Sequence, residues 1–143
     1  MMTKLTKYQK EALRIDKHIS LTANAGSGKT TVLSKRFVEI LLQENILLSN
    51  IVAITFTEKA ASELYTKIAK ELDERITNSN SIIKVRLETI RRNLVSAKIS
   101  TIHSFCIDIL KDFAPEAGID ANFLPIDART SDELLEQSID EII

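Results

Sequence analysis

Lys29 and Thr30 end a stretch of small and polar residues whose spacing suits the binding of a nucleoside triphosphate. The stretch reads Ala-Asn-Ala-Gly-Ser-Gly-Lys-Thr. Small residues allow successive backbone N–H groups to converge on phosphate oxygens, and the start of a following helix adds free N–H groups and a positive dipole end. The lysine would lie along the β- and γ-phosphates, and the threonine hydroxyl would coordinate Mg²⁺. The predicted nucleotide-binding residues here are Ala23, Asn24, Ala25, Gly26, Ser27, Gly28, Lys29, Thr30 and Thr31, with Lys29 also catalytic and Thr30 also the metal ligand.

The elements around this loop must present it at the end of a strand. An apolar run at 19–22 precedes it, and an amphipathic helical pattern at 31–43 follows it. A strand, a glycine-containing loop and a helix in this order form a P-loop. A simple helix-capping turn is the alternative, since the pattern begins with Ala23 instead of glycine. A dinucleotide-binding turn is disfavoured because its third glycine would fall at Thr31.

Composition limits the remaining function classes. The 143 residues suffice for one domain with its own core. Cys106 is the single cysteine, which excludes an internal disulfide and fits a reducing, cytoplasmic location. No apolar run approaches the length of a membrane span, so no membrane association is expected. His103 and Cys106 have ligand-like spacing, but only His18 remains to complete a metal site among His and Cys.

The net charge of −1 conceals an asymmetry along the chain. Residues 1–114 carry 18 Lys and Arg against 12 Asp and Glu, whereas residues 115–143 carry 1 against 8. A basic body suits a phosphate-rich partner.

The hydrophobic pattern predicts an α/β fold. The run 51–56 is nearly all apolar, which predicts a strand covered on both faces of a parallel sheet. Helices are predicted at 6–13, from 58 to a turn at 78–81, around 83–94 and at 103–113, with a third strand at 97–102. Thr130 and Glu133 predict a capping box for a last helix, which reaches Ile143 without an end signal. The chain is therefore expected to be part of a longer protein.

Four segments occur in an order that resembles a known family: 5–9, the phosphate loop, 54–61 (Ile-Thr-Phe-Thr-Glu-Lys-Ala-Ala) and 100–106 (Ser-Thr-Ile-His-Ser-Phe-Cys). They resemble the N-terminal motor domain of superfamily 1 DNA helicases of the UvrD/Rep/RecB group. The wording of the loop and of the last segment is closest to AddA/RecB-type helicase–nuclease subunits. The resemblance implies a RecA-like P-loop domain with a parallel sheet core. Residues 1–114 would form part of motor domain 1A, and residues 115–143 would begin the inserted subdomain 1B.

The resemblance also implies residues that contact the base of ATP. Gln9 occupies the position of the family's adenine-reading glutamine, and its amide can both donate and accept. Arg36 matches an arginine that lies against the base, where a planar guanidinium stacks well. An exposed helix glutamine and a solvated helix charge are the alternatives that involve no ligand.

Two further segments would touch single-stranded DNA. Thr55, Phe56 and Thr57 follow the 51–56 strand, and Thr101 and His103 end the next strand. Hydroxyls and amides can bind phosphates, and aromatic rings can stack on bases. The alternatives are a core aromatic at Phe56 and a buried structural histidine at His103.

Two acidic positions are excluded as ligand-binding residues. Many relatives carry Asn at position 58, and the carboxylate of Glu58 would repel phosphate, so we expect it to favour the start of the following helix. Asp127 is rejected as the Mg²⁺-binding acid because Pro125 argues against a central strand before it and Ala128 replaces the expected second acid.

The chain is predicted to be the N-terminal part of an ATP-dependent, 3′-to-5′ DNA helicase. Such a helicase couples ATP hydrolysis to movement along single-stranded DNA, here in double-strand-break repair and recombination. The polarity comes from the resemblance alone. An acid pair and a second motor domain are missing, so this stretch alone is expected to be inactive. Its expected partners are single-stranded DNA and a second helicase–nuclease subunit. The alternatives are a small P-loop nucleoside kinase or NTPase, and a non-catalytic module that binds ATP or DNA.

Overall fold

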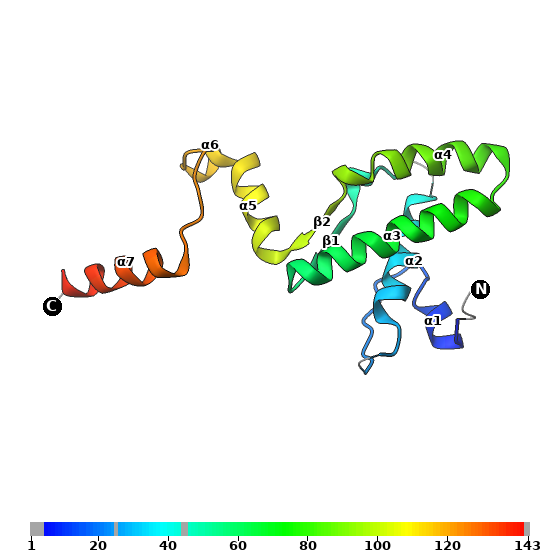
Figure 1. The fold of residues 1–143 in the computed structure, drawn as a ribbon, viewed down its shortest axis with the longest axis horizontal. Helices are drawn as coiled ribbons and strands as arrows, with labels where there is room; N and C mark the ends of the chain where they lie inside the picture. The colour runs from blue at the N-terminus through cyan, green and yellow to red at the C-terminus, as the bar shows by residue number, and fades with distance from the viewer. Residues whose placement is uncertain (1–4, 25, 44–45, 142–143) are drawn as a thin grey trace. The chain divides into compact units, whose positions relative to one another are not determined.

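The computed structural model describes residues 5–24, 26–43 and 46–141 (Figure 1). One compact unit extends to Phe105 and a second starts at Cys106. The predicted division into 1–114 and 115–143 refers to motor subdomains and stays a prediction. The elements are α1 (Lys7–Glu11), α2 (Lys29–Leu41), η1 (Leu48–Asn50), β1 (Val52–Thr55), α3 (Glu58–Asn78), α4 (Ser81–Arg92), η2 (Leu94–Ser96), β2 (Lys98–Thr101), α5 (Ile102–Asp112), α6 (Ala114–Ala117) and α7 (Ala128–Asp140).

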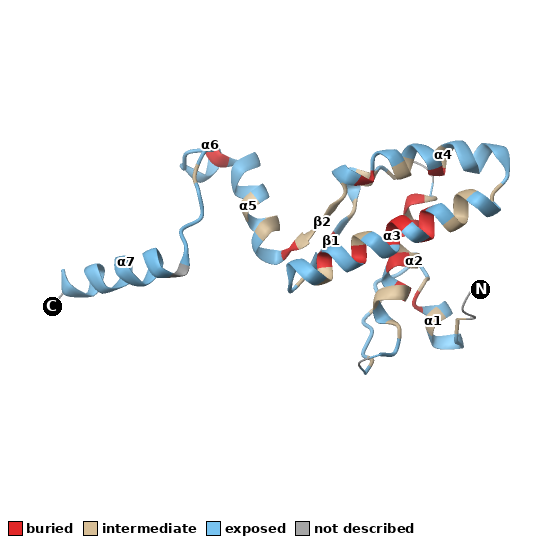
Figure 2. Cartoon of the chain, viewed as in Figure 1, coloured by how far each residue is buried: buried red, intermediate tan, exposed pale blue. Residues whose placement is uncertain are grey.

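Three helices of the first unit build its core. The apolar positions of α3 recur every three or four residues, as predicted, and form one buried stripe. This stripe packs against α2 on one side and α4 on the other, with α3 and α4 side by side (Figures 1 and 2). Helix α3 ends before Ser79 and α4 begins after Asn80, whose side chain accepts from the Ile83 N–H, so the predicted turn is confirmed. The buried cluster comprises Phe37, Val38, Leu41, Ala53, Leu64, Ile68, Ala69, Leu72, Leu87 and Leu94.

The sheet consists of two parallel strands in the described part of the chain. Strands β1 and β2 pair in a register that places Thr55 opposite Thr101. Ala53 is buried in the core beneath α3, but Val52 and Ile54 on the opposite face remain 42% and 46% exposed. The prediction that β1 is covered on both faces is therefore wrong for this structure, because the described residues leave the side chains of the second face largely exposed.

The predicted strand at 19–22 is also absent. Residues 19–22 have no strand assignment, and Leu21 is exposed. A strand exists only when a neighbour supplies hydrogen bonds, and β1 and β2 pair only with each other among the described residues. The structure is thus helix-rich α/β with a small parallel sheet.

An ionic network joins α2 to α3. The buried carboxylate of Glu71 accepts from Lys35 Nζ at 2.5 Å and from Arg75 Nε at 3.0 Å, and Arg75 also bonds Glu39 at 2.5 Å. Burial alone would raise the pKa of Glu71, but the hydrogen bonds from Lys35 and Arg75 outweigh it and lower the pKa below the usual value of a glutamate. The ionised form of Glu71 therefore stabilises the packing of α2 on α3.

Acidification is expected to weaken this packing through Glu71. A carboxyl whose pKa is lowered by folding stabilises the folded state at pH values above its pKa in the unfolded chain. This stabilisation is lost as the pH falls through the lower pKa of the folded state. Glu71→Gln removes the charge and places amide donors beside two cations, so we expect it to cost about 1–3 kcal/mol at neutral pH. Thermal unfolding measured from about pH 6 to about pH 3 should show a smaller acid-induced loss in this variant than in the wild type. An identical pH dependence in both proteins would contradict the assignment.

The predicted helices beyond residue 100 form, but the last one begins elsewhere than expected. Asp127, not Thr130, is the N-cap of α7, and its side chain accepts from the Thr130 N–H at 2.8 Å. This backbone hydrogen bond lowers the pKa of Asp127. Glu133 pairs with Arg129 at 2.9 Å instead of closing a capping box. The predicted box at Thr130 is wrong because an ionised aspartate three residues earlier is an equally good cap.

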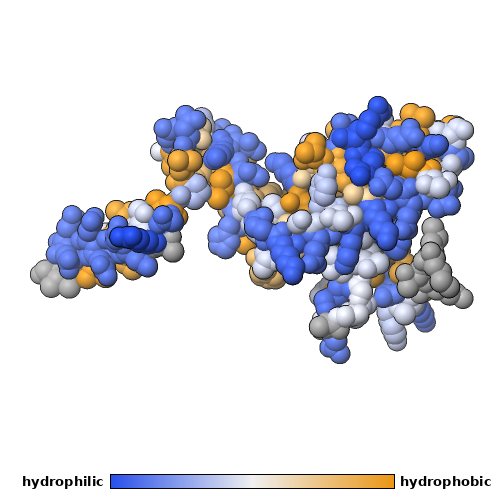
Figure 3. Space-filling model, viewed as in Figure 1, coloured by the Kyte–Doolittle hydropathy of each residue, from blue (hydrophilic) through white to orange (hydrophobic). Residues whose placement is uncertain are grey.

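Some apolar side chains remain at the surface. Ile82 and Val85 on α4 are largely exposed, and Figure 3 shows apolar atoms among polar ones over this helix. In the described part of the chain, no helix combines the length and the apolar composition needed to cross a bilayer.

Candidate nucleotide-binding and DNA-binding sites

The predicted phosphate loop contains two glycines with left-handed backbone angles. Gly26 and Gly28 have φ values of +76° and +86°, in the left-handed region that favours glycine. Gly28 is the N-cap of α2 and supplies no side-chain cap to its free N–H groups. A Cβ at position 28 would lie 3.1 Å from Nε2 of Gln9. The backbone angle therefore favours glycine here, and a Cβ would also require the end of the Gln9 side chain to shift slightly.

Lys29 lies over the loop. Its ammonium donates to the carbonyl oxygens of Ala23 and Asn24, each at 2.7 Å. A lysine ammonium has three donors, so one remains for a ligand while both carbonyls stay bound. Thr30 is half-buried at the second position of α2, and the predicted contact at Ala25 lies outside the described residues.

Gln9 is brought to the loop from α1. Its Oε1 accepts from the Thr6 N–H at 2.9 Å, closing a capping box, and its Nε2 donates to the Ser27 carbonyl at 3.1 Å. The bond to Ser27 uses one of the two N–H donors of the amide, and the bond from Thr6 uses one of the two lone pairs of its oxygen. The remaining donor and acceptor can still pair with the edge of a base, and the amide is fixed in orientation.

A cavity of about 360 Å³ lies where these groups meet. Its lining combines apolar and polar side chains, a composition typical of small-molecule sites. The lining residues are Thr6, Tyr8, Gln9, Leu21, Thr22, Ala23, Ser27, Lys29 and Val32. The structure therefore places Gln9 and Lys29, which are 20 positions apart in the sequence, on one hollow.

Arg36 is bound to the segment that joins α1 to the loop. Its guanidinium donates to the carbonyl of Ala12 at 2.8 Å, to that of Arg14, and to that of Lys17 at 3.4 Å. These contacts use N–H groups that lie in the guanidinium plane. Its contact with a base stays a prediction.

The two predicted DNA segments lie at the same edge of the sheet. Because β1 and β2 are parallel and in register, Thr55 and Thr101 end their strands side by side. Phe56 directly after β1 is 97% exposed, so the core-aromatic alternative is excluded. His103 is also exposed, which excludes the buried structural histidine. Loops at the carboxyl ends of parallel strands are where ligands bind in such sheets.

The threonine hydroxyls of this edge are engaged within the protein. Thr55 Oγ1 donates to the Thr57 carbonyl at 3.0 Å, and Thr57 Oγ1 caps α3 by accepting from the Ala60 N–H at 3.1 Å. Thr101 is only 6% exposed. In this structure, then, Phe56, Thr57 and His103 are the exposed members of the predicted DNA set, Thr55 is half-buried and Thr101 is buried.

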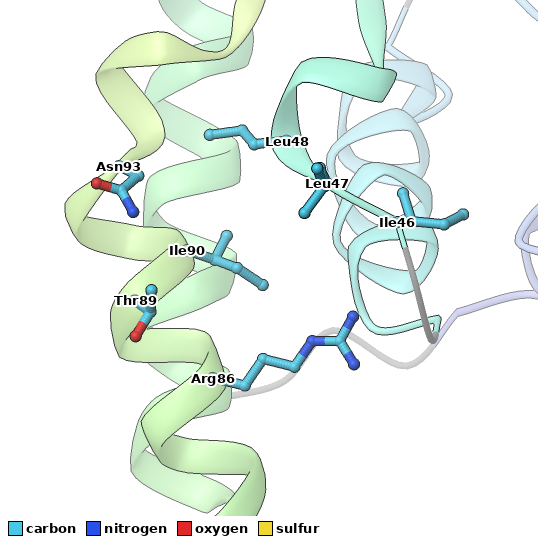
Figure 4. Close-up of a pocket in the computed structure, with 7 residues that line it drawn as sticks. All are labelled: Ile46, Leu47, Leu48, Arg86, Thr89, Ile90 and Asn93. Carbon is cyan, nitrogen blue, oxygen red and sulfur yellow. The ribbon is translucent and has the colours of Figure 1, made fainter.

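A larger hollow of about 520 Å³ lies away from these groups (Figure 4). It is formed by α4 and the segment before β1, with lining residues Ile46, Leu47, Leu48, Arg86, Thr89, Ile90 and Asn93. Arg86 donates to the carbonyls of Leu41 and Gln43 at the end of α2, which is a helix-capping role. Across the described ranges, no group of three or more His, Cys, Asp and Glu side chains could hold a metal ion.

The comparison with known families decides the assignment. Residues 5–142 match the model of the UvrD/REP helicase N-terminal domain. The chain belongs to this family. The UvrD/REP match includes the phosphate loop, the Gln9 segment and both predicted DNA segments.

Individual relatives of this UvrD/REP domain share one description, that of an ATP-dependent helicase/nuclease subunit. The protein from Lactobacillus johnsonii is 36% identical over 99% of this chain, and that from Oceanobacillus iheyensis is 35% identical over 99%. The protein from Listeria innocua is 33% identical over 88%. The alignments cover 12%, 12% and 10% of these relatives, so the chain spans about a tenth of their length.

Two residues of this UvrD/REP domain were missed by sequence reasoning. Tyr8 is 77% exposed and lines the cavity beside Gln9, although nothing in its spacing distinguishes it from a surface tyrosine. Glu58 was expected only to favour the start of α3, whereas its carboxylate accepts from Thr101 and Ser104. Only the pairing of β1 with β2 brings these residues together.

Proposed function

We propose that this chain is the N-terminal part of an ATP-dependent DNA helicase. Residues 1–114 would form part of a RecA-like motor domain, and residues 115–143 would begin an inserted subdomain. The intact protein would move 3′-to-5′ along single-stranded DNA and act in double-strand-break repair and recombination. The observation that carries the proposal is the convergence of Gln9, the phosphate loop and Lys29 on one cavity. A cavity with convergent donors beside a helix N-terminus suits a base joined to a triphosphate.

The residues of the cavity fit ATP in two parts. The phosphates would be held by the backbone N–H groups of the 23–31 loop and by the ammonium of Lys29. The base would face the amide of Gln9, with the guanidinium face of Arg36 near it. Mg²⁺ would be held by the hydroxyl of Thr30 and by the nucleotide's own oxygens, and it would neutralise charge on the phosphoryl group.

Single-stranded DNA would lie across the carboxyl end of the sheet. Phe56 offers an aromatic face to a base, and such stacking tolerates any sequence. His103 can donate to a phosphate or stack. Thr55, Thr57 and Thr101 would support this surface, with their main-chain N–H groups as the remaining donors to phosphate.

The partner of this activity is proposed from the names of the relatives. Those proteins are described as subunits of a helicase/nuclease, which supports a second, different subunit for this chain too. The single cysteine is exposed and unpaired, which supports a reducing, cytoplasmic location.

Strand displacement by the full-length protein tests this proposal. With Mg·ATP, we expect it to unwind a duplex with a 3′ single-stranded tail and not one with a 5′ tail, and oligo-dT should stimulate its ATP hydrolysis. ATP hydrolysis that is indifferent to DNA would contradict the helicase assignment and favour a small NTPase. Displacement from 5′ tails alone would overturn only the polarity.

A further inference from the structure

A cluster of three side chains joins the two predicted DNA segments. Oε1 of Glu58 accepts from Thr101 Oγ1 at 2.9 Å and from Ser104 Oγ at 3.1 Å. The three residues come from the first position of α3, the end of β2 and the first turn of α5. The Glu58 cluster, Glu58, Thr101 and Ser104, therefore connects the backbone that follows Phe56 to the backbone that presents His103.

The hydrogen bonding within the Glu58 cluster is closely determined. The two hydroxyl oxygens also lie 2.9 Å apart, and Thr101 Oγ1 accepts from the Ser104 N–H at 3.2 Å. Two hydroxyl protons thus serve three contacts, and a carboxylate is the strongest acceptor among them. If this acceptor were removed, the Thr101 hydroxyl would lose a hydrogen bond. Water could not easily replace that bond, because Thr101 is buried.

Both bonds end on one oxygen of Glu58, which separates two roles of the side chain. A glutamine at this position could place its carbonyl oxygen where Oε1 lies and accept both bonds. Its amide nitrogen would then replace Oε2, and the negative charge would disappear. Acceptor geometry and charge can therefore be tested independently.

We propose that Glu58 is a positioning residue with two opposed effects on the DNA surface. As an acceptor it holds the ends of β1 and β2 so that Phe56 and His103 face the strand together. As a negative charge it weakens the attraction of DNA phosphates to that surface. This inference rests on the proposed function, because it requires single-stranded DNA to bind at this edge of the sheet.

Binding of fluorescent oligo-dT to the full-length protein tests the inference with two substitutions. Glu58→Gln keeps the hydrogen bonds and removes the charge, so we expect about two- to fivefold tighter binding at low salt, with the difference shrinking as salt rises. Glu58→Ala removes the charge and the bonds, so we expect weaker binding than with glutamine at every salt concentration. Glutamine should thus rescue what alanine loses.

Three outcomes would overturn the inference. Equal tightening by glutamine and alanine would remove the positioning role, and unchanged binding by glutamine would remove the effect of charge. Glu63→Gln removes the same charge from an exposed position of α3, and tightening equal to that of Glu58→Gln would show a general charge effect. If the alanine variant does not fold, glutamine against wild type still decides the effect of charge. Ser104→Ala, which removes one hydrogen bond to Glu58 and keeps the charge, then decides the positioning role, because oligo-dT binding equal to that of the wild type would overturn it.

Phe56→Ala separates failure of this inference from failure of the proposed function. Loss of one stacked base should weaken oligo-dT binding about five- to hundredfold. If Phe56→Ala has no effect, the DNA surface itself is wrong. If it weakens binding while both Glu58 variants match the wild type, only the role of Glu58 is wrong.

Discussion

Lys29→Ala is expected to weaken ATP binding by the full-length protein about ten- to hundredfold. Among the described residues, its ammonium is the one charged donor that lies at the phosphate loop, where it is already 2.7 Å from two loop carbonyls. A charge-assisted hydrogen bond to phosphate is worth about 1.5–3 kcal/mol, which gives this range of affinity. Equilibrium titration with a fluorescent ATP analogue measures the effect.

A matched substitution controls for the loss of positive charge. Lys67 is an exposed lysine on α3, so Lys67→Ala should leave ATP affinity unchanged while lowering the net charge equally. Loss of affinity in both variants would indicate a non-specific electrostatic effect. Unchanged affinity in Lys29→Ala would mean that the 23–30 loop does not hold phosphates, and the nucleotide site would have to lie elsewhere.

The helices were predictable because their signals are local. Ala61, Leu64, Ile68 and Leu72 recur at helical spacing in the sequence, and each is buried in α3. The phosphate loop was equally local, since its glycines, lysine and threonine lie within a few positions of one another in the chain. Periodicity and turn chemistry need no knowledge of distant residues, so these parts could be predicted from the sequence alone.

Features that depend on distant partners were not predictable. The 19–22 run has strand-like composition but no neighbour to pair with among the described residues. Its pattern indicates a propensity, whereas pairing is a tertiary property. In the same way, Val52 and Ile54 are apolar enough for a strand buried on two sides, and the described structure covers one.

In the candidate sites, too, local features could be predicted and contacts between distant residues could not. The sequence suggested Lys29 through the phosphate-loop motif and Gln9 through resemblance, but their shared cavity arises from a contact between Gln9 and Ser27 across 18 positions. Glu58, which was not expected to bind a ligand, connects the two predicted DNA segments, and the sequence did not indicate this because its partners lie more than 40 residues away. Exposure resolved the alternatives at Phe56 and His103, and exposure cannot be read from residue type alone.

The largest loss of stability is expected from Leu72→Ala. The Leu72 side chain is completely buried in α3, in the cluster that also contains Leu41 of α2 and Leu87 of α4. Truncation removes apolar contacts on both sides and leaves a cavity that rigid helices fill only in part, which costs about 2–5 kcal/mol. Hydrogen exchange of the α3 amides should accelerate by about thirtyfold or more, because exchange of core amides follows this free energy. Ile82→Ala, a comparable deletion at an exposed position of α4, should change exchange little. Equal effects of the two substitutions would contradict the packing of α3 between α2 and α4, and with it the framework that holds the loop and Gln9 around one cavity.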